Sequence, residues 1–340
     1  MKRKRILMMT LPDLVPPDTI EDERAAADAP WKTDYDVMIG LRELDHEVFT
    51  LGIEEGLDQL DAEIAEVRPH IVFNLMEQFA GHPRFVAYML GHLELSGIAY
   101  TGCNPVGMMF SNNKALQRKI LRHHRIPTPD FMIVPRGRTI RRPNRLTFPL
   151  IVKSLVEHGS AGISQASVVS SDEKLAERVA YIHESIGTDA IVEDYIEGRE
   201  LYLGMLGNER LETFPLWEMR ITELREGAPR IATQRLKWDS EYQERVGLTL
   251  GPAEDIDDVV RARVERTCRR AYKALEQSGY ARFDLRLTPS GRAVVIESNP
   301  NPDLAYDAEF AEAAAAAGYE YPRLMQRILN LGLRWKARSA

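Results

Sequence analysis

The stretch Tyr280-Ala-Arg-Phe-Asp-Leu-Arg-Leu287, the turn Thr288-Pro-Ser-Gly291 and the stretch Val294-Val-Ile-Glu-Ser-Asn-Pro300 decide the fold of this chain. Both flanks alternate apolar and polar residues around a turn-forming Pro-Ser-Gly, which predicts a β-hairpin. The apolar run from Val294 to Ile296 indicates that the hairpin lies in a buried sheet. The alternative is a solvated hairpin whose charged residues face water.

The polar side chains of this hairpin are predicted to converge. Because successive side chains on a strand point to opposite faces, Arg282 and Asp284 share one face of the first strand. Glu297 and Asn299 share one face of the second strand, and Glu297 lies about as far from the turn as Asp284. Two carboxylates and a carboxamide beside a guanidinium suit Mg²⁺, which takes few protein ligands and fills its other positions with phosphate oxygens and water.

Length and composition bound the class of protein. At 340 residues the chain can hold two or three domains, and its 44% apolar and 28% charged residues are typical of globular proteins. The net charge of -7 gives no electrostatic reason to expect nucleic acid or a membrane as partner. The basic run Lys2–Arg5 precedes only Ile6–Met9, which is too short for a signal-peptide core or a membrane span. Cys103 and Cys268 are too few for a disulfide framework or a zinc site, so we expect a reduced, cytoplasmic protein.

The chain is predicted to form three α/β segments, residues 1–112, 113–197 and 198–340. In the first, short apolar strands alternate with helix, which favours a parallel sheet with helices on both faces. Its predicted elements are strands at Ile6–Thr10, Glu47–Leu51 and Ile71–Leu75 and a helix at Arg84–Leu95. The acidic, proline-rich stretch Pro12–Pro30 is an unusually long loop, and such loops are often functional or mobile.

The other two segments also mix strands and helices. The second is predicted to have a helix beginning near Asn113-Lys114, strands at Phe131–Val134, Leu150–Lys153 and Ala190–Ile196, and a helix at Glu173–Ser185. The third is predicted to have strands at Leu201–Leu206 and Phe214–Met219, the hairpin, and helices at Ile256–Gln277, Ala308–Ala316 and Pro322–Leu329. A loop is expected near Trp238–Gly251, and this loop and Pro12–Pro30 are candidate lids.

A possible phosphate-binding loop follows the strand Leu150–Lys153. In Glu157-His-Gly-Ser-Ala-Gly162, Gly159 and Gly162 lack a Cβ, so backbone N–H groups there can approach a phosphate that Lys153 also reaches. The pattern matches neither the Walker motif nor a Rossmann glycine fingerprint, and a lysine before a loop with two glycines is common.

Further along, Glu193–Ile196 ends a strand and Glu200 lies in the turn that follows it. A carboxylate at such a place can accept hydrogen bonds from ribose hydroxyls, but a charged turn in water explains the same residues. Lys114 and Lys237, each taken alone, are as readily surface residues as nucleotide ligands.

The order of these pieces resembles the ATP-grasp superfamily. Lys114, Lys153 with its glycine loop, the glutamate-rich strand end, Lys237 and the hairpin follow one another as they do in those proteins. Within the superfamily, the chain resembles D-alanine–D-alanine ligases over nearly its full length. The resemblance is closest from Tyr280 to about Ile328, and Ile98-Ala-Tyr-Thr-Gly102 looks like the end of that family's first domain.

The resemblance implies an α/β protein with an ATP-grasp fold and an N-terminal parallel-sheet (pre-ATP-grasp, Rossmann-like) domain. It implies an enzyme that uses ATP and two Mg²⁺ to phosphorylate a carboxylate and then joins the acyl phosphate to an amine, releasing ADP and phosphate. The expected partners are small-molecule or peptide substrates, and the family suggests a homodimer.

The resemblance also implies roles for single residues. The residues implied in ATP binding are Lys114 and Lys153 for the phosphates, the loop with Gly159 and Gly162, Glu193, Asp194, Tyr195 and Ile196 for adenine, and Glu200 for ribose. The residues implied in catalysis are Arg282, Lys237 at the γ-phosphate, and Ser160. The residues implied to carry Mg²⁺ are Asp284, Glu297 and Asn299. Arg282 would neutralise charge that develops on the phosphoryl group.

Several positions depart from the family. The first loop, Met9–Pro17, lacks the family's small-residue turn and its ammonium-gripping glutamate. Gly159 replaces the first of two serines, and Trp238 replaces a tyrosine after Lys237. After Asn299, a run that would grip the acceptor's carboxylate carries Asp303 where a glycine is expected. The nucleotide and metal positions are kept while the positions that read D-alanine differ, which predicts a ligase whose substrates are not two D-alanines.

Three other interpretations stay open. The chain can be a true D-alanine–D-alanine ligase with a diverged pocket, a non-catalytic ATP-binding regulator, or a phosphotransferase that stops at a phosphorylated product.

Overall fold

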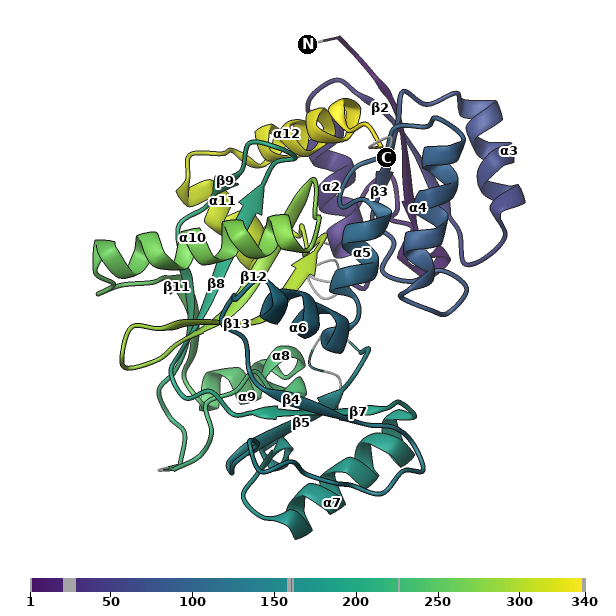
Figure 1. Cartoon of the computed structure of the whole chain (residues 1–340). Helices are drawn as coiled ribbons and strands as arrows, with labels where there is room; N and C mark the ends of the chain where they lie inside the picture. Colours follow the sequence, from purple (N-terminus) through teal and green to yellow (C-terminus); the bar gives the residue numbers. More distant parts are fainter. Residues whose placement is uncertain (1, 21–28, 158–159, 161, 226, 338–340) are drawn as a thin grey trace.

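The computed structural model describes residues 2–20, 29–157, 160, 162–225 and 227–337. Three sheets lie one after another along the chain, each covered by helices. In Figure 1 the purple and blue N-terminal segment and the green and yellow C-terminal segment lie together, with the teal central segment below them.

The first segment is built on a parallel sheet, as predicted. Strands β1 (Arg5–Thr10), β2 (Glu47–Gly52) and β3 (Ile71–Asn74) lie in the order β2-β1-β3, and Tyr100 extends the sheet through a parallel bridge to Val72. Its other elements are the short helix η1 (Pro12–Leu14) and the helices α2 (Lys32–Arg42), α3 (Leu57–Val67), α4 (Phe85–Leu95) and α5 (Pro105–Ser111). Alternate residues of β1 contact different cores, so both faces of the sheet are covered.

The central segment is a four-stranded antiparallel sheet backed by one long helix. Its strands, β4 (Phe131–Val134), β5 (Leu150–Ser154), β6 (Val168–Val169) and β7 (Ala190–Asp194), lie in the order β4-β7-β5-β6. Its helices are α6 (Lys114–His123), η2 (Gln165–Ser167) and α7 (Asp172–Tyr181), which continues as the π-helical turn η3 (Ile182–Ile186). Leu175 and Val179 of α7 pack on Val152 and Val192 of the sheet.

The C-terminal segment contains the predicted hairpin at the edge of an antiparallel sheet. The strands are β8 (Arg199–Leu206), β9 (Glu212–Thr213), β10 (Trp217–Ile221), β11 (Leu248–Pro252), β12 (Tyr280–Leu287) and β13 (Ala293–Pro300), in the order β11-β10-β8-β12-β13 with β9 beside β8. The helices are α8 (Gln234–Trp238), α9 (Ser240–Arg245), α10 (Asp258–Ala274), α11 (Glu309–Ala316) and α12 (Tyr321–Arg334).

One predicted loop is ordered structure instead. The region Trp238–Gly251 contains α9 and most of β11, so the expectation of a loop there is wrong. Asp239 caps α9 by accepting a hydrogen bond from the backbone N–H of Tyr242, and β11 pairs with β10. The sequence shows no strong apolar period here because α9 has only six residues, and Val246 is buried while Tyr242 and Leu248 are only partly buried against the core.

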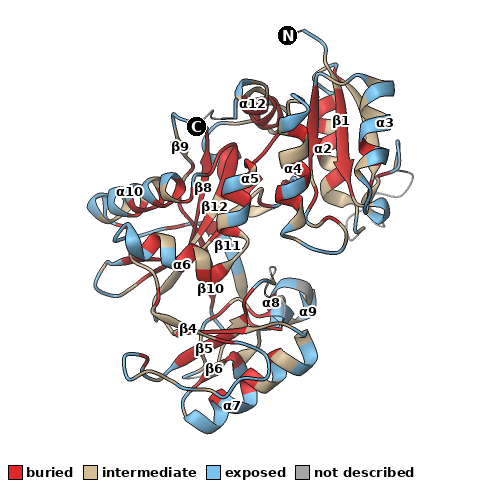
Figure 2. Ribbon diagram, turned by 45° about the vertical axis from the view of Figure 1, so that its right-hand side comes forward, coloured by how far each residue is buried: buried red, intermediate tan, exposed pale blue. Residues whose placement is uncertain are grey.

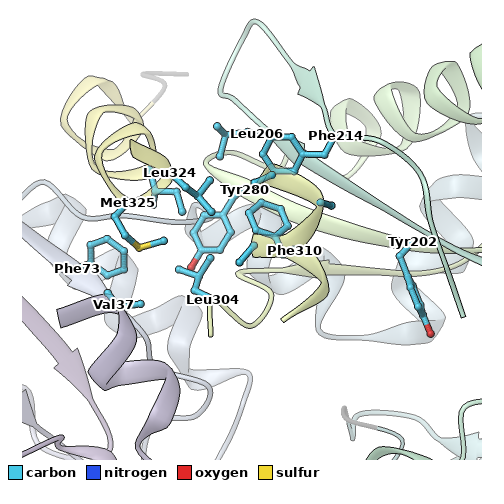
Figure 3. Packing of buried hydrophobic residues seen from close by; sticks show 14 of the residues in the cluster. Val37, Phe73, Tyr202, Leu206, Phe214, Tyr280, Leu304, Phe310, Leu324 and Met325 are labelled. Atoms are coloured by element: carbon cyan, nitrogen blue, oxygen red, sulfur yellow. The ribbon is translucent and has the colours of Figure 1, made fainter. Parts of the chain in front are cut away.

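The first and last segments share one hydrophobic core. Leu324, Met325, Ile328 and Leu329 of α12 pack against Phe73 and other side chains of the N-terminal sheet, and Figure 3 shows Met325 beside Phe73 and Val37. Tyr280, Phe310 and Phe214 continue this core into the C-terminal sheet (Figure 3). Figure 2 shows β1 of the N-terminal sheet and β8 and β12 of the C-terminal sheet as largely buried. Among the residues described, no helix is long and apolar enough to cross a membrane.

Candidate functional site

The predicted pairing within the hairpin is confirmed. Asp284 lies directly opposite Glu297, and Arg282 lies opposite Asn299. Beyond Asp284 the register shifts, because Leu285 pairs with Val295 and leaves Ile296 as an extra residue in β13. This β-bulge next to Glu297 is the kind of irregularity that turns side chains toward a site.

Arg282 and Asp284 form a bidentate ion pair. The Nε–Oδ1 distance is 2.8 Å, the Nη2–Oδ2 distance is 3.1 Å, and Asn299 Nδ2 donates to Asp284 Oδ2 over 3.0 Å. Burial raises the pKa of Asp284, although Arg282 opposes this effect. Burial disfavours the Arg282 cation, but Asp284 and Glu309 outweigh it and raise the pKa of Arg282. Arg282 therefore stays charged at every physiological pH.

Lys114 joins the hairpin to the central segment. Asn113 caps α6, and Lys114 in the first turn places its Nζ 3.0 Å from Glu297 Oε1 and 2.5 Å from the carbonyl oxygen of Glu157. The side chain of Lys114 is only 7% exposed. Lys114 also lines a cavity, so its ammonium group can exchange these two oxygen acceptors for phosphate oxygens.

A second lysine, Lys153 on β5, is held by a buried carboxylate. Its Nζ lies 3.1 Å from Glu193 Oε2, and Arg118 Nε lies 2.7 Å from Glu193 Oε1. Burial alone would raise the pKa of the fully covered Glu193, but Arg118 and Lys153 outweigh it, so this pKa is lowered. Glu193 is thus a buried anion, and it is paired with two cations, Arg118 and Lys153.

Most of the predicted residues surround one cavity of about 130 Å³ between β5 and the β8–β12–β13 face. The predicted residues that line it are Lys114, Lys153, Ser160, Glu200, Lys237, Arg282, Asp284, Glu297 and Asn299. Apolar side chains of Ile151, Ile231, Leu285 and Ile296 are also part of the lining. A cavity with cations, carboxylates and apolar walls has the composition expected of a nucleotide site.

Among the residues that the structure describes, five predicted ones do not line this cavity: Gly162, which is treated below, and the four residues from Glu193 to Ile196. Glu193 is covered completely, and Asp194, Tyr195 and Ile196 lie where β7 ends. Burial raises the pKa of Asp194, with the nearby charge of Asp130 adding to the effect.

The end of the predicted phosphate loop is hydrogen-bonded to the segment that precedes Lys237. Gly162 donates its backbone N–H to Gln234 Oε1 over 3.0 Å, and Gln234 donates its backbone N–H to Ile163 over 2.9 Å. Gly162 lines a neighbouring open cavity rather than the one around Lys114. Ser160 has a left-handed backbone, with φ of 62°. Gly159 lies outside the described residues.

Three residues of the site were not expected from the sequence. Arg118 follows Lys114 by one helical turn, Tyr202 is two residues after Glu200, and Arg286 is two residues after Asp284. The periods of helix and strand place each on the same face as its predicted neighbour, so this signal was present. Tyr202 lies opposite Asp284 and Glu200 lies opposite Arg286 in the β8–β12 ladder.

The hairpin residues fit a magnesium ion by their chemistry. Two carboxylates and a carboxamide meet at the cavity, and oxygen donors of this kind suit Mg²⁺ when phosphate oxygens supply the remaining ligands. Within the described part of the chain, no group of three or more His, Cys, Asp or Glu residues is placed to hold a metal ion. With so few carboxylates, this site is better suited to a metal ion that binds together with a nucleotide than to a metal ion that is held by protein ligands alone.

Known proteins resemble this chain in sequence and in structure. The family profile described as "D-ala D-ala ligase C-terminus" matches residues 120–330. An uncharacterized protein of Sinorhizobium fredii, y4sG, is 32% identical over 264 residues, which cover 78% of this chain and 75% of that protein. A D-alanine–D-alanine ligase of Desulfotalea psychrophila is 28% identical over 246 residues, covering 72% and 73%.

Solved structures share the fold at lower identity. The D-alanine–D-alanine ligase of Bacillus anthracis, in complex with ATP, superposes with a TM-score of 0.74 at 21% identity, covering 97% of this chain and 98% of that one. The VanG D-Ala:D-Ser ligase of Enterococcus faecalis gives a TM-score of 0.69 at 19% identity, covering 97% and 100%. This chain belongs to the D-alanine–D-alanine ligase family of the ATP-grasp superfamily.

Proposed function

We propose that this protein is an ATP-dependent, ADP-forming ligase that joins a carboxylate to an amine through an acyl phosphate. The observation that carries the proposal is the cavity in which Arg282, Asp284, Glu297 and Asn299 face Lys114 and Lys153. Membership of the family supports the same activity. We expect a cytoplasmic enzyme and, from the family, a homodimer.

The chemistry proceeds in two displacements. A carboxylate oxygen of the first substrate attacks the γ-phosphorus of ATP, and the bond to ADP breaks. The amine nitrogen then attacks the carbonyl carbon, the bond to phosphate breaks, and the amine loses its proton. Phosphoryl transfer depends mainly on positioning and charge neutralisation, which the cations that line the cavity can provide.

The residues of the cavity divide this work. Lys114 and Lys153 bind the phosphates, and the buried Glu193 keeps Lys153 in place. Lys237 reaches the γ-phosphate from the end of α8, and Glu200 accepts from ribose. The segment Glu193–Ile196, which is not part of the cavity lining, is expected to hold adenine. Arg282 neutralises charge on the transferred group, and Ser160 lines the same cavity. Asp284, Glu297 and Asn299 would hold two Mg²⁺, which supply charge neutralisation at the phosphates when bound.

The loop around Ser160 and helices α8 and α9 are proposed to act together as a lid. The hydrogen bonds between Gly162–Ile163 and Gln234 support this because they join the two segments. A closed lid would keep water from the acyl phosphate. The other candidate lid, Pro12–Pro30, includes residues 21–28 outside the described range.

We propose that the substrates are not two D-alanines and that one of them is cationic. Asp303 follows the hairpin, and its Oδ1 accepts a hydrogen bond from Thr33 Oγ1 over 2.7 Å. Beside it, Asp34 is only 3% exposed, and no lysine, arginine or histidine among the described residues forms an ion pair with it. Glu77 adds a third negative charge near Asp34. Such a region repels the carboxylate of D-alanine and attracts a protonated amine.

The test is amine-dependent release of ADP and phosphate across a panel of carboxylates and amines, with mass detection of products. The panel includes D-alanine and the matched pair 1,4-diaminobutane and 1-aminobutane. We expect a product mass equal to a condensation, with the diamine preferred by about tenfold or more. Efficient turnover of D-alanine alone would instead identify a D-alanine–D-alanine ligase with a diverged pocket. Nucleotide binding without release across the panel would favour a regulator, and a phosphorylated product without amide would identify a phosphotransferase.

A further inference from the structure

Arg286 is a buried cation in the wall of the cavity that none of the proposed steps uses. It lies on β12 with its side chain on the same face as Arg282 and Asp284, and it is 6% exposed. Its Nη2 lies 2.5 Å from Glu200 Oε2, and the two residues are direct partners across the β8–β12 ladder. A buried arginine needs such acceptors, and this one finds a carboxylate that itself faces the cavity.

The Glu200 carboxylate is held at both oxygens. Arg286 donates to Oε2, and the hydroxyl of Tyr202 donates to Oε1 over 3.1 Å. A carboxylate has about four acceptor positions, so each oxygen keeps one for a ligand. Two neighbouring ribose hydroxyls match a carboxylate whose oxygens are fixed in this way, because both donors can be accepted without any rotation of the side chain.

The other donors of Arg286 reach two backbone carbonyls. Nη1 lies 3.0 Å from the oxygen of Gly198, and Nη2 lies 2.7 Å from the oxygen of Arg230. Gly198 lies where the central segment passes into the C-terminal segment. Its φ is 150°, and a Cβ there would lie 2.3 Å from the carbonyl oxygen of Leu287. The chain is therefore held tightly against β12 beside Arg286.

The Arg230 carbonyl precedes two more residues of the cavity. Ile231 and Ala232 line the cavity and lead into α8, which ends next to Lys237. Arg286 thus joins Glu200 to Gly198, which precedes β8, and to Arg230, which precedes the segment leading into α8. These contacts fix Glu200 relative to both segments. An apolar residue at this position would leave a charged glutamate without its strongest partner.

We propose that Arg286 is a positioning residue that holds Glu200 for the ribose hydroxyls and thereby makes the protein select ribonucleotides over deoxyribonucleotides. This rests on the proposed function, in which Glu200 binds ribose. A site built to accept a hydroxyl rejects an analogue that lacks it, because the acceptor is left unpaired.

The test is calorimetric binding of ADP, 2′-deoxyADP and 3′-deoxyADP with Mg²⁺, which needs no knowledge of the other substrates. The wild type is expected to prefer ADP over at least one deoxy analogue by about tenfold or more. Arg286→Met should remove most of that preference and Arg286→Lys should keep part of it, since lysine retains the charge without the fork. In a Glu200→Gln background, Arg286→Met should have little further effect on the preference.

Arg199→Met is the matched control. Arg199 also forms a bidentate pair on the same sheet, with Glu218 at 2.7 and 2.6 Å, and also donates to backbone carbonyls, but it does not line the cavity. It should change stability and leave the preference unchanged. An unchanged preference in both Arg286→Met and Arg286→Lys would overturn this role, although ADP binding would still support the proposed function. Failure of the wild type to bind any of the three nucleotides would overturn both.

Discussion

Glu297 lies at the centre of the candidate site, opposite Asp284 and 3.0 Å from Lys114. We expect Glu297→Gln to lower turnover by orders of magnitude, because the substitution removes a charged Mg²⁺ ligand while keeping the shape of the side chain. Steady-state ADP release at increasing Mg²⁺ measures the effect. Glu173→Gln, an exposed residue at the start of α7, serves as the control and should behave as the wild type. Full turnover in Glu297→Gln would contradict the metal assignment.

Asp34 is a residue whose charge is expected to cost stability. Burial raises its pKa to about 6, with the charges of Glu77 and Asp303 adding to the effect and the Thr10 hydroxyl opposing it. The pKa in the folded state is therefore above that in the unfolded chain. The contribution of Asp34 to the free energy of unfolding is therefore fully present at low pH. This contribution is lost as the pH rises through about 6.

We therefore expect Asp34→Asn to stabilise the protein at pH 8, by up to about 3 kcal/mol, and to have a smaller effect at pH 5. Urea unfolding at the two pH values measures the difference. Asp36→Asn is the control, because Asp36 has Lys32 as a partner at 3.1 Å and should give no gain. If Asp34 also binds a substrate cation, Asp34→Asn gains stability and loses preference for the diamine, as expected of a functional site. Equal stability of both proteins at pH 8 would contradict the buried-charge argument.

At the scale of elements, the bulge in β13 determines which side chains enter the cavity. Ile296 is the extra residue opposite the Asp284–Leu285 step. Deletion of Ile296 should remove the bulge and bring β13 into regular register with β12. Because side chains alternate along a strand, either Glu297 and Asn299 or the core residues of β13 would then point to the wrong face of the sheet.

We expect the Ile296 deletion to fold and to lose Mg²⁺-dependent ADP binding, which calorimetry with and without EDTA measures. Ile296→Val keeps the bulge and removes one methylene, so it should bind nearly as well as the wild type. Retained Mg²⁺-dependent binding in the deletion would show that the bulge does not position Glu297 and Asn299.

At the scale of the whole molecule, α12 couples the first and last segments through their common core. Leu329 is fully buried in this core, together with residues of β1 and β8. We expect Leu329→Ala to lower the free energy of unfolding by about 2–5 kcal/mol. Hydrogen exchange should speed up in both β1 and β12, because the two sheets lose the same support.

Leu175→Ala is the matched control on the central segment. Leu175 is also fully buried, but in the core between α7 and the central sheet. Its loss should speed exchange mainly in β5 and β7. Faster exchange confined to the C-terminal sheet in Leu329→Ala would mean that the N-terminal sheet is stable without α12.

The sequence by itself determined the local parts of this protein. The two-residue period of 280–287 and 293–300 predicted the hairpin and the meeting of Asp284 with Glu297, because register within a hairpin depends on its turn. The apolar runs of the first segment likewise predicted a parallel sheet. The order of the lysines, glycines and carboxylates identified the superfamily.

Only the tertiary structure decided which distant residues share the site. The pairing of β8 with β12 places Glu200 against Arg286, and the packing of α6 places Arg118 on Glu193, 75 positions further along the chain. Nothing in the local pattern encodes these contacts, because strand order and helix packing result from burial of whole faces at once. For the same reason α9 and β11 were missed: their few apolar residues become core only when the rest of the sheet is in place.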